Sequence, residues 1–166
     1  MSVVILMGWA ALAGCAGHAV TDDANVDLRV HLVRQHGVGT GGLASARMLA
    51  RYYRLPLIPR AERVMRLASA SGELSSAELA EALEASGYRV SVFSGTLDHG
   101  EAGIFRNLDR GEPVIVIIGS SFMLVDGYGA GQMRLLDSKR GAMKVSADDF
   151  DRAWQDSGGL ALVAVR

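Results

Sequence analysis

The spacing of hydrophobic residues changes along the chain, from a helical period in the first half to strand-like runs in the second. Apolar residues three and four positions apart predict amphipathic helices. Such helices are expected at 43–53, at 60–70, from Ser75 or Ser76 to Gly87, at 100–110 and at 148–154. In the third of them, Glu78 is placed to complete a capping box with the serine.

Strands are predicted where apolar and polar residues alternate, or where an apolar run is uninterrupted. The expected strands are 28–33, 88–93, 113–118, 122–125, 132–136 and 160–165. The run 113–118 has no polar position, which is typical of a central strand buried on both faces. Gly127, Gly129 and Gly131 are expected to turn the fourth strand into the fifth. Helices first and an antiparallel sheet second predict the α+β class.

Length and composition favour one globular domain. The 166 residues include 17 Lys and Arg against 18 Asp and Glu, so the formal net charge is −1, which argues against a strongly basic nucleic-acid-binding protein. With 49% hydrophobic and 21% charged residues, the chain is not of the disordered class. A single cysteine excludes an intramolecular disulfide framework and a multi-thiolate zinc site. No cofactor or metal is expected.

That cysteine, Cys15, follows an apolar and uncharged stretch at 1–14. The stretch is too short to span a bilayer and has the length of a signal-peptide core. Leu12-Ala13-Gly14-Cys15 resembles the bacterial lipobox, which implies cleavage before Cys15 and acylation of its thiol. The alternative is an apolar N-terminal strand with a buried cysteine.

On the lipobox interpretation, 1–14 is a signal peptide, 15–27 a lipidated tether and 28–166 the folded domain. The protein is then anchored in the bacterial cell envelope by lipid on Cys15, and no thiol is left for catalysis. By resemblance to known sorting rules, Ala16 favours the outer membrane, facing the periplasm.

A glycine-rich loop is expected at 35–42, between the first strand and the first helix. Gly37, Gly39 and Gly42 match the dinucleotide pattern G-x-G-x-x-G. However, no good second parallel strand and no Walker sequence follow, so nucleotide binding is disfavoured.

The same segment resembles another family. Gln35-x5-Gly41-Gly42-Leu43-Ala44-Ser45-x2-Met48-x3-Tyr52-Tyr53 resembles the papain-like bacteriocin-processing peptidases, the double-glycine leader peptidases of ABC exporters. The resemblance continues through Gly111-Glu-Pro113, Phe122-x2-Val125-Asp126-Gly127-Tyr128, Leu136-Asp137, Trp154 and 158–163. It implies a papain-like cysteine-peptidase fold of the α+β class, with N-terminal helices packed on a C-terminal antiparallel sheet and a cleft between them.

The reactive residues of that family are not present. Gln35 falls on its oxyanion-hole glutamine and Asp137 on its histidine-orienting aspartate, but the nucleophilic cysteine falls on Gly41 and the histidine on Ser121. Because these groups act as a unit, the resemblance implies a pseudopeptidase rather than an enzyme. The expected function is binding of a peptide or protein, in export, maturation or assembly of a secreted or envelope protein.

The residues expected to bind that peptide are Gln35, Thr40, Gly41, Gly42 and Ser121. Two other functions stay open: an unorthodox peptidase that uses Thr40 or Ser45, and a structural envelope lipoprotein. Purely structural roles also stay open: Gln35 would bond the glycine loop, and Asp137 would be a turn residue. Five arginines are expected either on a solvated helix face or on a binding surface: Arg47, Arg51, Arg54, Arg60 and Arg63.

Overall fold

The computed structural model describes residues 25–37, 40–71 and 74–166. The predicted signal peptide, the predicted lipobox at Cys15 and most of the predicted tether lie outside these residues. The helices are α1 (Gly41–Tyr53), α2 (Pro59–Ser71), α3 (Ser76–Ala85), α4 (Ile104–Asp109) and α5 (Ala147–Asp156). The strands are β1 (Val26–Asp27), β2 (Arg89–Ser94), β3 (Val114–Ile118), β4 (Ser121–Gly129), β5 (Gln132–Asp137), β6 (Gly141–Ser146) and β7 (Leu160–Val165).

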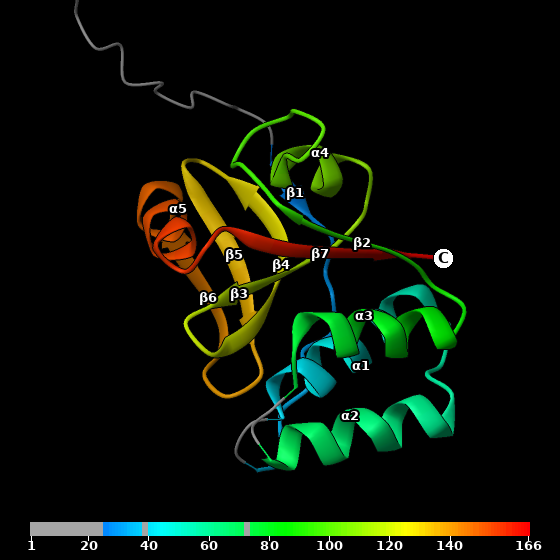
Figure 1. Cartoon of the computed structure of the whole chain (residues 1–166). Coiled ribbons are helices and arrows are strands. Elements are labelled where there is room, and N and C mark those ends of the chain that lie inside the picture. Colours follow the sequence, from blue (N-terminus) through cyan, green and yellow to red (C-terminus); the bar gives the residue numbers. More distant parts are fainter. Residues whose placement is uncertain (1–24, 38–39, 72–73) are drawn as a thin grey trace, which may run out of the picture.

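One antiparallel sheet of seven strands organises the domain, in the order β2-β7-β3-β4-β5-β6, with β1 paired to β4 (Figure 1). Helices α1, α2 and α3 share a hydrophobic core with one face of the sheet. Helices α4 and α5 share a second core with the other face. The expected α+β class is therefore confirmed, with helices on both faces instead of one.

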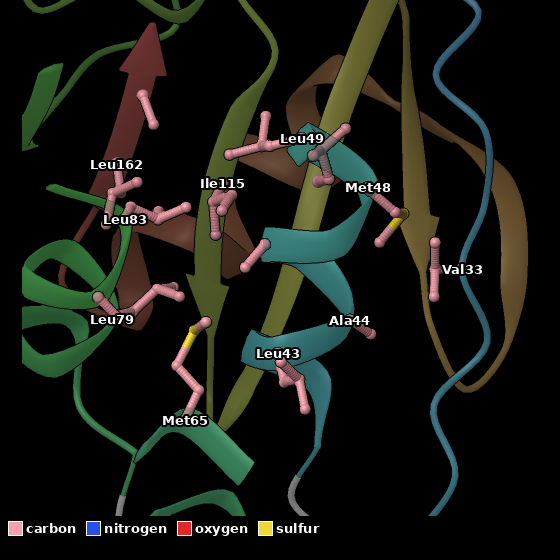
Figure 2. Packing of buried hydrophobic residues seen from close by; sticks show 14 of the residues in the cluster. Val33, Leu43, Ala44, Met48, Leu49, Met65, Leu79, Leu83, Ile115 and Leu162 are labelled. Atoms are coloured by element: carbon pink, nitrogen blue, oxygen red, sulfur yellow. The ribbon is translucent and has the colours of Figure 1, made fainter. Parts of the chain in front are cut away.

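Strand β3 lies at the centre of both cores. Ile115 faces the core of α1, α2 and α3, whereas Val114 and Val116 face the core of α4 and α5. All three side chains are fully buried. The uninterrupted apolar run thus marks a strand covered on both sides, as expected. Figure 2 shows Ile115 among the leucines and methionines that α1, α2 and α3 contribute.

The strand expected at 28–33 does not form. Arg29 has a φ of 54°, a left-handed conformation that interrupts a strand. The neighbouring N–H groups bond instead to one residue of β4: that of Leu28 donates to the Asp126 carbonyl and that of Val30 to the Asp126 carboxylate. Strand β1 precedes this segment, so the folded domain begins at least two residues before the expected boundary at 28.

The expected turn at Gly127 is also wrong, because β4 continues to Gly129. At Gly127 the chain passes so close to β1 that an added Cβ would lie 2.3 Å from the Val26 carbonyl oxygen. The turn into β5 lies at Ala130 and Gly131, which both have positive φ. Strand β6 was not expected. The other helices and strands are found within a few residues of their predicted positions, and the Ser75–Glu78 capping box is present.

Candidate functional site

The N-terminus of α1 forms one wall of a cleft. The helix begins at Gly41, directly after the loop that contains Gln35. An added Cβ at Gly41 would lie 3.5 Å from the Phe122 carbonyl oxygen and 3.6 Å from the Gln35 Oε1. These are ordinary van der Waals distances. A side chain at position 41 would therefore project between Gln35 and the first residues of β4.

The cleft itself has a volume of about 680 Å³. It runs between the start of α1, the turn from β3 to β4 and the turn from β5 to β6. Its lining residues are Arg34, Gln35, Gly37, Gly41, Ser120, Ser121, Phe122, Asp137, Ser138, Lys139 and Arg140. The structure therefore brings Gln35, Gly41, Ser121 and Asp137 to one cleft, although they lie up to a hundred residues apart in the sequence.

Gln35 is fixed by hydrogen bonds at both ends of its side chain. Its Oε1 accepts a hydrogen bond from the Ser138 hydroxyl at 2.7 Å, and its Nε2 donates to the Gly37 carbonyl at 3.0 Å. Its backbone N–H also donates to the Ser138 carbonyl at 3.1 Å. The glutamine thus ties the glycine loop to the β5–β6 turn. Ser138 is buried, and the sequence did not predict its role at the cleft. The one signal for it was its position next to Asp137.

Asp137 holds the β5–β6 turn in shape. Its Oδ1 accepts hydrogen bonds from the N–H groups of Lys139, at 2.7 Å, and Arg140, at 3.1 Å. Its Oδ2 lies 3.6 Å from the Arg140 Nε. These contacts are those of an aspartate that caps a turn. The structure thus contains the contacts of both non-catalytic interpretations: Gln35 bonds the glycine loop, and Asp137 is a turn residue.

Comparisons with known proteins identify the scaffold. A family model described as "Peptidase C39 family" matches residues 29–165. The chain belongs to the peptidase C39 family. No curated protein matches the sequence significantly.

Several solved C39 domains share its fold. The double-glycine-motif protease of an AMS/PCAT transporter, crystallised with the leader peptide, has a TM-score of 0.68 at 18% identity, covering 84% of this chain and 93% of that one. The peptidase domain of Streptococcus ComA, a bifunctional ABC transporter, has a TM-score of 0.62 at 18% identity, covering 82% and 98%. A C39-like peptidase from Bacillus anthracis has a TM-score of 0.66 at 14% identity, covering 87% and 98%. The papain-like interpretation of the fold is confirmed.

Two residues expected to bind the peptide, Thr40 and Gly42, are not among those that line this cleft. Thr40 lines a smaller neighbouring hollow, and its hydroxyl donates to the Gly37 carbonyl at 3.2 Å. Gly42 is buried: an added Cβ would lie 2.5 Å from the Leu74 Cδ2 and 3.3 Å from the Phe122 ring. Gly42 thus packs beneath the cleft in this structure, and its contact with a bound peptide stays a prediction.

Ser45 cannot act as a nucleophile in this conformation. Its side chain is completely buried in α1, and its hydroxyl has no hydrogen-bond partner within the described part of the chain. No base can reach it there. Of the two residues considered for an unorthodox peptidase, this leaves Thr40, whose hydroxyl is already bonded to the loop.

No histidine lines the cleft in the described ranges. His31 and His36 are exposed, and His99 pairs with Asp109 at 2.9 Å, near the far end of the domain. Nor do residues 25–37, 40–71 and 74–166 contain a group of three His, Cys, Asp or Glu side chains that could hold a metal ion. Among the same residues, no helix is both long enough and apolar enough to cross a bilayer.

Proposed function

We propose that this C39 domain binds a peptide or protein segment in its cleft without cleaving it. The partner is a secreted or envelope protein undergoing export, maturation or assembly. Lipid on Cys15 anchors the domain in the bacterial envelope, and the outer membrane, facing the periplasm, is the compartment that Ala16 favours. Support comes from an open cleft on a peptidase scaffold, and from the related transporter protease crystallised with a leader peptide.

The observation that carries the proposal is the geometry at Gly41. The Cβ direction of this residue points into the cleft, toward Gln35 and the backbone of Phe122, but the residue has no side chain. In a thiol peptidase, the nucleophile at such a helix start has its pKa lowered by the backbone N–H groups and by a neighbouring imidazolium. Here no side chain occupies that place, and the cleft beside it has room for a bound chain.

The base position supports the same conclusion. Ser121 is exposed at the first residue of β4, on the cleft wall opposite α1. A serine hydroxyl neither takes up a proton at neutral pH nor forms an ion pair with a thiolate. Because nucleophile and base act together, losing both costs several orders of magnitude in rate. The fixed contacts of Gln35 and Asp137 then serve to shape the cleft.

Site-specific crosslinking in cells tests the proposal. A photoreactive phenylalanine replaces Gly41 in one variant and Ser91 in the other, where Ser91 is an exposed residue of β2 at the opposite edge of the sheet. We expect a defined adduct with a secreted or envelope protein from position 41 and none from position 91. The same adducts from both positions, or none from either, would contradict binding in the cleft.

A cleavage assay tests the non-catalytic half of the proposal. The purified domain is incubated with the captured partner and with a mixed peptide library, and products are followed by mass spectrometry. We expect no cleavage above buffer. Turnover that disappears in Thr40→Ala would instead establish the unorthodox peptidase, because Thr40 has the hydroxyl nearest to the start of α1 in the described loop.

A further inference from the structure

The cleft is one of three hollows that share lining residues along α1, and together they are called the groove. A second hollow, of about 250 Å³, adjoins it and shares Arg34 and Gln35 with it. A third, of about 470 Å³, lies between α1 and the chain that leads into α2, and shares Arg47 with the second. The three hollows together extend from the β5–β6 turn, past Gly41, to Arg54.

The charges along this groove are mostly of one sign. Its basic side chains are Arg34, Arg47, Arg51, Arg54, Arg66, Lys139 and Arg140. Its acidic side chains are Glu62 and Asp137. Glu62 pairs with Arg47 and lies 3.6 Å from Arg66, while Asp137 lies 3.6 Å from Arg140.

Four of the groove cations have no carboxylate partner among the described residues. Arg51, Arg54 and Lys139 make no ion pair there, and the Arg34 guanidinium donates to the Lys139 carbonyl at 2.9 Å. The sequence shows the same concentration of charge. Residues 28–71 contain eight arginines and one acidic residue, although the whole chain has a net charge of −1. Five of these eight arginines line the three hollows: Arg34, Arg47, Arg51, Arg54 and Arg66.

From this groove we infer the class of ligand: an extended, acidic polypeptide segment, with one part in the cleft beside Gly41 and its carboxylates over the arginines of α1. The inference rests on the proposed function and adds its specificity. Arg47 and Arg51 lie one turn apart on α1, and Arg54, the residue that ends this helix, lines the same hollow. The 13 residues of α1 span about 20 Å, a length covered by about six residues of extended chain.

Other anionic partners fit the groove less well. Single-stranded nucleic acid is bound through aromatic platforms, but Phe122 and His36 are the aromatic side chains among those that line the three hollows. A flat membrane surface does not enter a concave groove. In addition, β1, which follows the N-terminal segment, lies at the end of the domain opposite to α2 (Figure 1).

Peptide binding measured by fluorescence anisotropy tests the inference. The probe is a labelled ten-residue peptide of alternating Glu and Ser, and its controls carry Gln or Lys in place of Glu. We expect the Glu peptide to bind, and its affinity to fall as salt is added. In the Arg51→Gln/Arg54→Gln variant the affinity should fall about three- to tenfold. In the Arg89→Gln/Arg110→Gln variant, which removes the same charge from exposed sites outside the groove, it should stay within about twofold.

The outcomes separate this inference from the proposed function. Equal affinity for the Glu and Gln peptides would overturn the acidic specificity. If Gly41→Trp then abolished the binding of both peptides, the cleft would be supported as the binding site. Binding of the Glu peptide that depends on Arg51 and Arg54 but survives Gly41→Trp would overturn the cleft as the binding site. Equal losses in both double variants would show general charge attraction and refute a groove. Failure of all three peptides to bind would overturn the acidic ligand class, whereas the crosslinking result from position 41 decides the proposed function.

Discussion

Ionisation of Asp126 should weaken the fold where β4 meets the segment that follows β1. This carboxyl group is completely buried in β4, where one oxygen accepts a hydrogen bond from the Val30 N–H at 3.1 Å. The other oxygen lies 3.3 Å from the Arg134 Nε and has no hydrogen-bond partner in the described ranges. Burial raises the pKa of Asp126 to about 6, and Arg134 opposes the rise only in part.

The sign of the pH effect on stability follows from the raised pKa of Asp126. A folded-state pKa above the unfolded value of about 4 means that the folded protein binds the proton more tightly. The stabilisation is complete below about pH 4 and is lost as the pH rises through about 6. At about 1.4 kcal/mol per pKa unit, a shift of about two units corresponds to about 3 kcal/mol in the free energy of unfolding.

Urea unfolding between pH 3.5 and 7.5 measures this loss in the wild type, Asp126→Asn and Asp148→Asn. The last is a matched control at an exposed residue of α5. The stability of Asp126→Asn minus that of the wild type should rise by about 2–3 kcal/mol between pH 4 and 7. The subtraction removes shared contributions from Glu62 and Glu78, whose lowered pKa values act in the opposite direction. A flat difference would refute the reasoning, as would the same rise in the control.

Three further predictions concern the cleft, the cap of α3 and a hydrogen bond made by α1. In the Gly41→Cys/Ser121→His variant, the new thiol should react with iodoacetamide at pH 7 about tenfold faster than the thiol of Ser91→Cys. The reason is that the start of a helix and a neighbouring histidine lower the thiol pKa. Equal rates would contradict the cleft geometry. Ser75→Ala should lower the free energy of unfolding by about 1 kcal/mol through loss of the capping box, and Ser75→Asp should retain most of it. Tyr52→Phe should cost about 0.5–1.5 kcal/mol in the same urea assay, because its hydroxyl donates to the Gly111 carbonyl at 2.8 Å; no change would mean that water replaces this bond without loss.

Much of the fold could be predicted because local signals agreed with the tertiary packing. Ser75 and Glu78 mark the start of α3 by hydrogen bonds within three residues of each other. The apolar run of β3 needs no partner to be recognised as buried. The cleft positions Gln35, Gly41, Ser121 and Asp137 came from the family resemblance, since spacing alone does not bring residues so distant together.

The remainder depends on contacts between distant segments. The alternation at 28–33 predicted a strand, but the Asp126 side chain takes the Val30 N–H and Arg29 turns the backbone aside. Strand β6 was missed because its apolar residues, Met143 and Val145, are few and only half-buried. The groove is lined by residues of α1, α2 and the β5–β6 turn. Helical spacing alone could not predict that these segments come together.

The structure separates the positions that make the scaffold from those that would perform chemistry. Gly41 and Ser121 lie at the surface of the cleft and contribute no side chain to either hydrophobic core. By contrast, the next residue, Gly42, is packed so closely against Leu74 and Phe122 that a methyl group there requires one of them to move. We therefore expect substitutions at Gly41 and Ser121 to be nearly neutral for folding, because the side-chain hydrogen bonds of Gln35, Ser138 and Asp137 involve neither residue. On the proposed function, the C39 scaffold would thus keep the groove in which a peptide lies without the side chains that perform its chemistry.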